Sequence, residues 1–525
     1  MFIYLFGYII FSFHNFIAYF AKKKLNMSDF SLHSNLLERH LAKNASEFTL
    51  QDIVKFVSDQ NIEIVNFKYA AQDGRLKTLS FYVHSKEYLE NILTYGERVD
   101  GSSLFSFIEA GSSDLYVIPR YRTAFVNPFS EIPALDILCS FYTNEGKPLE
   151  SAPEYILHKS HQYFSKQTGL TFKALVELEF YVIAPLENNF LPTNQKGYHE
   201  SSPFIKYNDF RNHAMQLISQ CGGKIKYGHS EVGAFQDENY LYEQHEIEFL
   251  PSTVEDAADH VMIAKWILRN LAYKYNIHVS FAPKITVGKA GSGMHIHMLA
   301  EKDGKNQMLD GTNLSTTARK MIAGILSYAD AITAFGNTTP LSYMRLVPHQ
   351  EAPTNICWGD RNRSVLIRVP LGWTTSTPMI ELANPNITHP SYCIPEKQTI
   401  ELRSPDGTAD IYLLLSAIVV AATKGFSMPD ALELTDKLYV NVNIHKEDCK
   451  DKAKYLGHLP SSCFESAICL ENKKALFIES GVFPAGTIET IIKNLKNFDD
   501  THLREELSKD PDKLAQLVKE YLNYK

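Results

Sequence analysis

Two histidines, His295 and His297, lie two residues apart in the stretch GKAGSGMHIHM. Alternate residues of a β-strand point to the same face, so a strand in this stretch would present both imidazoles side by side. Such a pair could form a ligand or phosphate site, or it could be two histidines packed in a core. Residues elsewhere in the chain decide between these interpretations.

Glutamates alternate with apolar residues in KALVELEFYVI, which has the pattern of a strand. The apolar residues would pack on one face, and Glu177 and Glu179 would share the other. Two adjacent carboxylates repel each other and cost free energy if they are buried without a partner. A cation between them removes both costs, although a strand facing solvent would show the same pattern.

The same alternation recurs in other parts of the chain. Residues that would share a strand face are Glu246 with Glu248 and Glu401 with Arg403, and Glu231 lies upstream of the first pair. One such pair is common at a solvated sheet edge, but several together predict a curved sheet with a polar concave face. Many carboxylates with few histidines suit Mg²⁺ or Mn²⁺ better than zinc.

Arginines form a second group of charged residues. Four lie within 24 positions, and a fifth follows: Arg345, Arg361, Arg363, Arg368 and Arg403. Guanidinium groups bind carboxylate and phosphate through two hydrogen bonds, although a surface network of salt bridges would also contain many arginines. Carboxylates for metal ions together with arginines for phosphate indicate phosphoryl transfer. The chain has no Walker A run or glycine-rich kinase loop, which disfavours the familiar nucleotide folds.

The composition is that of a soluble globular protein with more than one domain. The chain has 525 residues, of which 45% are hydrophobic and 21% charged, and this length predicts two domains. A net charge of -8 argues against a nucleic-acid-binding protein. The seven cysteines are scattered without a C-x-x-C pair, which predicts free thiols in a reducing, cytoplasmic compartment.

Three regions are expected along the chain: an apolar extension at 1–26, a helix and a small sheet at 27–147, and a larger domain at 148–525. A helix is expected from residue 28 to about 60. The strands expected after it are 62–71, 75–83, 114–120 and 137–143. In the larger region we expect helices at 254–275, capped by Thr253, and at 410–426, with a charged helical tail from about 487.

The first 21 residues are apolar and aromatic and are followed by three lysines. The run is long enough for a membrane span with its lysines on the cytoplasmic side. The interpretation we favour is that translation begins at Met27, because MSDFSLHSNLLERHL reads as an ordinary soluble start. A membrane partner is therefore not expected.

Six motifs in order carry a resemblance to a known family. They are DGSSLFSF (100–107), ELEF (177–180), GSGMHIH (291–297), RLVPHQEAP (345–353), RNRSVLIR (361–368) and IELRSPD (400–406). Together they resemble glutamine synthetase of the bacterial type I kind, from about residue 45 to 490.

The resemblance implies an α+β fold with a small N-terminal β-grasp domain and a larger catalytic domain, in which helices wrap a curved antiparallel sheet. It implies a homo-oligomer, usually a double-ring dodecamer, with active sites between neighbouring subunits. The implied activity is ATP-dependent ligation of ammonia to L-glutamate through γ-glutamyl phosphate, giving glutamine, ADP and phosphate. Two or more Mg²⁺ or Mn²⁺ ions are implied at each site.

The resemblance also assigns roles to individual residues. One metal site would comprise Glu179, Glu231 and Glu246, and the other Glu177, His295 and Glu401. Residues contacting ATP phosphates would be His297, Arg363 and Arg368, and those binding glutamate would be Gly291, Arg345, Glu351, Arg363 and Arg403. The catalytic residues would be Asp100, which reaches the adjacent subunit's site, Glu351 on a closing flap, and Arg363.

The chain departs from the family pattern at a few positions. Ala290 stands where the family usually has an Asn that helps hold the substrate's amino group. Extra residues follow Glu231, so Glu238 and Glu243 compete with Glu246, which has the better local match in QHEIEF.

Two rival functions remain open from the sequence. The first is a relative that joins glutamate to another amine, such as a polyamine, which Ala290 favours and the RNR run at 361–363 disfavours. The second is a non-catalytic scaffold of the same fold. A scaffold should have lost some metal carboxylates, yet all six metal positions can be filled here, so we expect an enzyme.

Overall fold

The structure is a computed structural model. It describes residues 32–524 except 107, 109–112, 348–351, 373–378, 385, 387–396, 445–454 and 508. The expected apolar extension at 1–26 and the expected flap residue Glu351 lie outside the described residues.

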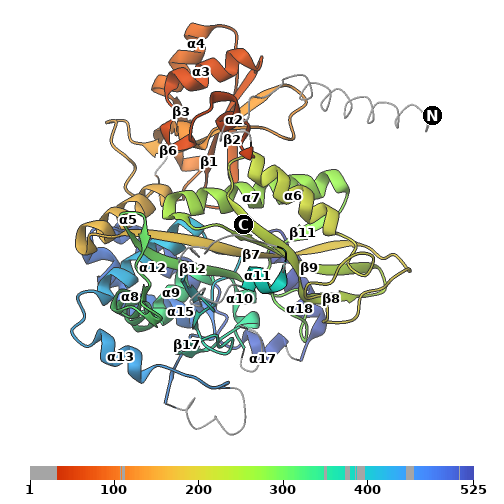
Figure 1. The fold of residues 1–525 in the computed structure, drawn as a ribbon, viewed down its shortest axis with the longest axis vertical. Coiled ribbons are helices and arrows are strands. Elements are labelled where there is room, and N and C mark those ends of the chain that lie inside the picture. Colours follow the sequence, from red (N-terminus) through yellow and green to blue (C-terminus); the bar gives the residue numbers. More distant parts are fainter. Residues whose placement is uncertain are drawn as a thin grey trace.

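The smaller N-terminal part of the chain is built on one mixed sheet (Figure 1). Its strands run in the order β2-β1-β6-β4-β3, with β5 beside β6, and β1 and β6 are parallel. The strands are β1 (Ile64–Ala70), β2 (Leu76–Tyr82), β3 (Glu97–Asp100), β4 (Asp114–Pro119), β5 (Phe125–Val126) and β6 (Ala134–Tyr142). The helices are α2 (Leu36–Leu41), α3 (Leu50–Asp59) and α4 (Lys86–Tyr95). The expected β-grasp fold is confirmed.

The expectation of a single helix from residue 28 to about 60 is wrong, because the structure has two separate helices there, α2 and α3. Helix α2 ends at Leu41, because the next residue, Ala42, has a left-handed backbone (φ 51°). Helix α3 then starts afresh after Thr49, whose Oγ1 accepts a hydrogen bond from the Asp52 N–H in a capping box. Helix α4 and strand β3 were not expected.

The larger part contains a sheet in the order β17-β18-β19-β12-β7-β9-β8. These strands are β7 (Thr171–Pro185), β8 (Ile225–Gln236), β9 (Tyr240–Phe249), β12 (Met294–Lys302), β17 (Trp358–Asp360), β18 (Ile367–Val369) and β19 (Ile400–Leu402), joined at the margins by β10 (Ser252–Thr253), β11 (His278–Ser280) and β13 (Lys305–Asn306). The expected curved antiparallel sheet is confirmed, except that β17 and β18 are parallel. Outside this sheet, β14 (Leu309–Asp310) pairs with β15 (Asn313–Leu314), and β16 (Asn355–Ile356) pairs with β20 (Gly457–His458).

Helices cover the apolar face of this sheet (Figure 1). The helices of the larger part are α5 (Pro153–Thr168), α6 (Asn208–Gln220), α7 (Val254–Tyr275), α8 (Thr316–Ser327), α9 (Ala329–Gly336), α10 (Pro340–Arg345), α11 (Met379–Ala383), α12 (Ile411–Gly425), α13 (Ala431–Lys437), α15 (Cys463–Glu479), α16 (Ala485–Lys496), α17 (Leu503–Leu507) and α18 (Pro511–Tyr521). Of these, α5, α6, α7 and α8 lie directly against strands of the sheet. Helix α7 is capped by Thr253 as expected, and α12 is the expected apolar helix, buried on nearly every side. Among the described residues, no helix is long and apolar enough to cross a membrane.

Buried charges fasten the smaller part to the larger one. Arg120, just after β4, donates two hydrogen bonds to Asp259 of α7, at 2.7 and 3.0 Å. Tyr412 of α12 donates a third to the same carboxylate at 2.8 Å. Lys68 of β1 lies 4.3 Å from the ring centroid of Trp266, also on α7. Helix α7 therefore links the β-grasp sheet to the body that carries the polar face.

Candidate active site

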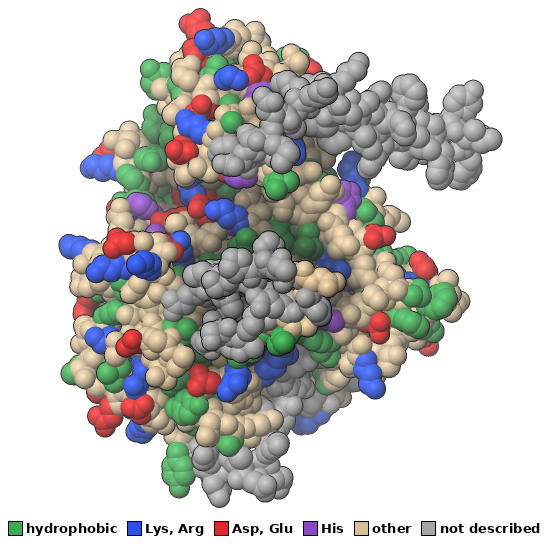
Figure 2. Space-filling model, in the orientation of Figure 1, with side chains coloured by type: hydrophobic (Ala, Val, Ile, Leu, Met, Phe, Trp, Pro, Cys, Tyr) green, Lys and Arg blue, Asp and Glu red, His purple; other side chains and the backbone are tan. Residues whose placement is uncertain are grey.

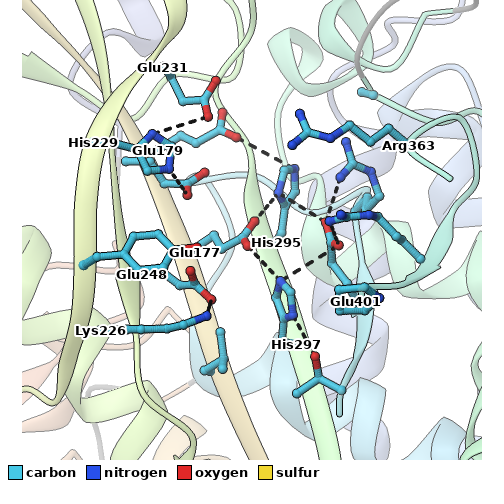
Figure 3. Close-up of a pocket in the computed structure, with 18 of the residues that line it drawn as sticks. Glu177, Glu179, Lys226, His229, Glu231, Glu248, His295, His297, Arg363 and Glu401 are labelled. Carbon is cyan, nitrogen blue, oxygen red and sulfur yellow. Dashed lines mark hydrogen bonds and ion pairs between the residues drawn. The ribbon is translucent and has the colours of Figure 1, made fainter. Parts of the chain in front are cut away.

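A cleft of about 1100 Å³ lies on the polar face of the large sheet. Side chains from the central strands face into it (Figure 3). The residues expected from the sequence that line it are Glu177, Glu179, Glu231, Glu246, Gly291, His295, His297, Arg345, Arg363, Arg368, Glu401 and Arg403. Strand alternation thus brings together stretches that are far apart in the chain.

The pairing register of the strands sets which of these side chains are neighbours. Glu177 on β7 lies opposite His295 on β12, and opposite Glu248 on β9. Glu179 lies opposite Glu246 on β9. Directly opposed residues share a face at close range, so three strands present carboxylates and imidazoles to one small volume.

Glu177, His295 and Glu401 form one group whose ligand atoms lie within 4.8 Å of one another. His295 Nδ1 lies 2.8 Å from a Glu177 oxygen and 3.7 Å from a Glu401 oxygen. Burial raises the pKa of Glu177, but His297 and His295 outweigh it and hold that pKa well below its usual value. This group coincides with the second metal site expected from the sequence, whose metal role stays a prediction.

The first expected metal set is arranged differently in space. Glu179 and Glu246 group with His295, whereas Glu231 and Glu246 group with His229. His229 Nε2 lies 3.2 Å from Glu246 and its Nδ1 lies 3.8 Å from Glu231. Glu246 therefore joins the two groups.

One histidine and one glutamate of these groups were not predicted as site residues from the sequence. His229 lies two residues before Glu231, and Glu248, although noted as a strand partner, groups with Glu177 and His297. In both cases the signal was the alternation that had already been used for neighbouring residues.

Two buried carboxylates in these groups have raised pKa values, and a cation bound beside them would favour their charged forms. Burial raises the pKa of Glu179 to about 7, and the nearby Glu231 adds to the effect. Burial, with repulsion from Glu177 and Glu179, raises the pKa of Glu246 well above its usual value. Oxygen-rich groups of this kind, with one imidazole each, fit hard divalent cations.

His297 is held between two partners of different chemistry. Its Nε2 lies 2.8 Å from Glu177 Oε1, and its Nδ1 lies 3.0 Å from the hydroxyl of Thr399. Burial lowers the pKa of His297, but the charge of Glu177 outweighs this and raises it. A histidine that keeps its proton adds positive charge to the cleft, which favours a bound anion.

Arginines line the wall opposite the glutamates of β7 and β9 (Figure 3). Glu401 accepts hydrogen bonds from Arg403 at 2.7 Å and from Arg368 at 2.9 Å. Burial raises the pKa of Glu401, but Arg403 outweighs it and lowers that pKa. Arg363 is exposed, with its guanidinium 5.9 Å from the ring centroid of Tyr198.

Arg345 is bound to the backbone more closely than its expected role suggests. It is 5% exposed, and its guanidinium donates to the carbonyls of Ser404, Pro405 and Arg403 at 2.8 to 3.3 Å. It also lies against Gly291, where an added Cβ would come within 3.0 Å of the Arg345 side chain. Arg345 therefore braces the end of β19 against the turn that contains Gly291.

Three other acidic positions lie outside the cleft. Asp100 is exposed at the end of β3 and accepts hydrogen bonds from Ser102 and Ser103, which lower its pKa. Glu243 accepts the backbone N–H groups of Lys206 and Tyr207. Glu238 is exposed between β8 and β9. The geometry thus favours Glu246 over the two residues that competed with it.

The cleft has further lining residues that were not among the expected site residues. Its lining combines apolar side chains with charged ones: Leu175, Leu250, Leu299, Leu371, Lys173, Glu301 and Lys397. Lys173 lies 2.6 Å from Glu301 across the β7–β12 pair. Leu175 and Leu299 are buried, whereas Leu250 and Leu371 are exposed. Apolar surface beside charged groups suits an aromatic ring system, such as a nucleotide base.

Models of two protein-family domains match the chain. The model for "Glutamine synthetase, catalytic domain" matches residues 150–510, and that for "Glutamine synthetase, beta-Grasp domain" matches residues 61–144. The chain belongs to the glutamine synthetase family. It is accordingly a ligase of the glutamate–ammonia ligase class.

Similar proteins cover most of the chain. A glutamine synthetase of Thermotoga maritima is 30% identical over 72% of this chain and 80% of its own. One of Microchaete diplosiphon is 29% identical over 85% of this chain and 94% of its own.

Solved structures of the glutamine synthetase fold resemble it as well. A Plasmodium falciparum glutamine synthetase superimposes with a TM-score of 0.70 at 21% identity, over 87% of this chain and 97% of the other. A chain described as "GmaS/ADP complex-Conformation 1" gives 0.67 at 19%, over 87% and 96%.

Proposed function

We propose that the protein is a glutamine synthetase that joins ammonia to L-glutamate at the expense of ATP, through γ-glutamyl phosphate. The observation that carries this proposal is that two sides of one cleft carry opposite kinds of charged groups. Carboxylates and imidazoles on β7, β8, β9 and β12 face arginines beside β18 and β19. Such groups can hold metal-bound phosphates close to an acidic substrate.

The proposed metal ligands are the two sets of residues expected from the sequence. Glu177, His295 and Glu401 would hold one divalent cation, and Glu179, Glu231 and Glu246 another, with His229 close enough to take part. Mg²⁺ or Mn²⁺ bound there would neutralise charge on the phosphates of ATP. His297, Arg363 and Arg368 would contact the phosphates directly.

The side-chain carboxylate of glutamate is a poor acyl donor until its oxygen becomes part of a better leaving group. Transfer of the terminal phosphoryl group of ATP to that carboxylate supplies one, because phosphate then departs when an amine attacks. Arg363 and Arg368 would offset the negative charge during the transfer. Arg403, Arg345 and the backbone of Gly291 would hold the rest of the glutamate.

Ammonium becomes nucleophilic when it loses a proton. Asp100 of a neighbouring subunit would attract ammonium and accept that proton, and Glu351 on the flap would shield the acyl phosphate from water. The proposal therefore includes a homo-oligomer with sites between subunits, which in this family would be a dodecamer. It also places the enzyme in the cytoplasm.

A second candidate is a ligase that joins glutamate to an organic amine. Ala290 in the turn beside Gly291 favours it, since this residue offers no polar side chain to an amino acid. The structural likeness to the chain described as "GmaS/ADP complex-Conformation 1" covers 87% of this chain, although it shows the fold alone.

Phosphate release from ATP by the purified protein distinguishes these candidates. Reactions contain L-glutamate and Mg²⁺ with ammonium, methylamine or putrescine, and a reaction without amine gives the background. We expect release with ammonium above the other two amines. Release with an organic amine but not with ammonium would establish the second candidate and reject the first.

A further inference from the structure

The turn beside Gly291 is fastened by a loop that the sequence motifs do not include. We call residues 288–292 the substrate turn and residues 193–199 the fastening loop. The fastening loop lies between β7 and α6, and it runs along the outer edge of β8. The N–H groups of Gln195, Gly197 and His199 donate to carbonyls of β8 at 2.8, 3.3 and 3.0 Å. Because every second residue is bonded, the loop has a fixed register against that strand.

Close approach of the two backbones depends on Gly197. A Cβ at this position would come within 2.5 Å of the carbonyl oxygen of Glu231. Gln195 itself has a left-handed backbone, with φ of 57°. This combination turns the Gln195 side chain away from β8 and toward the substrate turn.

Gln195 makes a specific contact with the substrate turn. Its Oε1 accepts a hydrogen bond from the Ala290 N–H at 2.7 Å. An amide nitrogen cannot accept a hydrogen bond, so this contact fixes which way the side-chain amide faces. The Nε2 group therefore points away from Ala290, and Gln195 lines the cleft.

Two carbonyl groups of the substrate turn are already bonded. The carbonyl of Ala290 accepts from the hydroxyl of Tyr181 at 2.8 Å, and that of Gly291 accepts from Gln244 Nε2 at 3.0 Å. By contrast, Gln195 Nε2 is buried and has no hydrogen-bond partner among the described residues. A buried donor without a partner is costly, which makes this group the one that an anionic ligand at the turn would satisfy.

We propose that Gln195 determines specificity in the amino-acid subsite, with Oε1 fixing the substrate turn and Nε2 donating to a carboxylate oxygen of the bound amino acid. This inference rests on the proposed function, because it takes glutamate as the acid beside Gly291. It concerns only the acid and is the same for any amine acceptor. It also explains how the subsite keeps a polar group beside Ala290, whose methyl group cannot form a hydrogen bond: the amide of Gln195 supplies it.

Two substitutions separate the two halves of this role. Gln195→Met keeps the length of the side chain and removes both hydrogen bonds. Gln195→Glu keeps an acceptor for Ala290 and replaces the donor with a negative charge. Lys196→Ala, at the exposed neighbouring position, is the matched control.

Steady-state kinetics with varied L-glutamate, and separately with varied ATP, test the proposal. We expect Gln195→Met to raise the KM for glutamate about tenfold, which is the loss of one hydrogen bond to a charged group. Gln195→Glu should raise it at least as much, because the new carboxylate repels the substrate. The KM for ATP should stay within about twofold of the wild-type value, and Lys196→Ala should match the wild type.

The possible failures have different signatures. A Gln195→Glu enzyme with the wild-type KM for glutamate would overturn the donor role. Equal rises in both KM values with a lower melting temperature would indicate a merely structural residue and would also overturn it. If the wild-type protein releases no phosphate from ATP with glutamate and each of the three amines in turn, the result rejects the proposed function and not the role of Gln195 alone.

Discussion

Glu246 is the residue at which the acidic groups of the cleft meet. It groups with Glu179 and His295 on one side and with His229 and Glu231 on the other. Burial and the neighbouring carboxylates raise its pKa, and a cation bound there would favour its charged form. A single change at this position therefore disturbs both groups.

We expect Glu246→Gln to lower turnover by more than about a hundredfold, since even changes to outer-shell partners of metals approach that loss. The variant should fold, because glutamine is isosteric with the protonated carboxyl. Glu238→Gln is the matched control, because this exposed glutamate was one of the two other candidates in the same stretch. Phosphate release at saturating Mg²⁺ gives the comparison, and equal activity of the two variants would reject Glu246 as a ligand.

Glu179 makes the stability of the metal-free protein depend on pH. Its pKa is raised from 4.5 to about 7, so between these values the folded state keeps a proton that the unfolded chain releases. The free energy of unfolding therefore falls as the pH rises through this range, and the cost is fully present above about pH 7.

Glu179→Gln should remove this cost, because glutamine resembles the protonated acid. In a chelating buffer, we expect the variant to melt above the wild type at pH 8 and close to it at pH 5. Added Mg²⁺ should raise the melting temperature of the wild type more than that of the variant. A difference in melting temperature that is constant with pH would contradict the assignment.

At the level of elements, alternation along strands could be read from the sequence, and register could not. Glu177, Glu179, His295 and His297 were placed on the correct faces because that pattern is local. Which of them meet depends on pairing between β7, β9 and β12, which is set by packing across the sheet. The role of Gln195 could not be predicted from the sequence for the same reason, since its hydrogen-bond partner Ala290 lies 95 residues away along the chain.

Helix positions show the same limit in a different form. The cap of α7 at Thr253 was predicted because a side-chain cap depends on a few adjacent residues. The break between α2 and α3 was missed, since Ala42 takes a left-handed backbone that alanine rarely adopts. The arginines of the cleft were predicted as a set, but not the backbone contacts that hold Arg345.

The attachment of the β-grasp sheet to α7 yields a prediction about stability. Arg120→Met would leave Asp259, which is 3% exposed, with Arg122 and Tyr412 as its remaining partners. We expect a loss of about 3 kcal/mol in the free energy of unfolding, because a buried carboxylate loses its main counter-charge.

Arg98→Met is the matched control for this change. Arg98 and Asp114 form an exposed pair at 3.9 Å in the same sheet, and such pairs contribute about 0–1 kcal/mol. Chemical denaturation of the two variants gives the comparison. Equal losses in both variants would mean that α7 is not the structural link described above.

For the whole molecule, the position of Asp100 is the feature that one chain does not explain. It lies at the end of β3 in the β-grasp sheet, exposed, and it does not line the cleft of its own chain. The family resemblance predicts that it completes the site of an adjacent subunit. If so, two variants that are each inactive can restore one another, because their defects lie in different halves of a shared site.

Asp100→Asn and Glu177→Gln provide this pair, and co-expression with two different affinity tags allows mixed oligomers to be isolated. A site is intact when its cleft comes from the first variant and its Asp100 from the second. With random assembly around a ring of equal subunits, about a quarter of the sites meet both conditions, so about a quarter of wild-type activity is expected. Each variant purified alone should stay near background. Mixed oligomers no more active than the separate variants would show that Asp100 acts within its own chain or not at all.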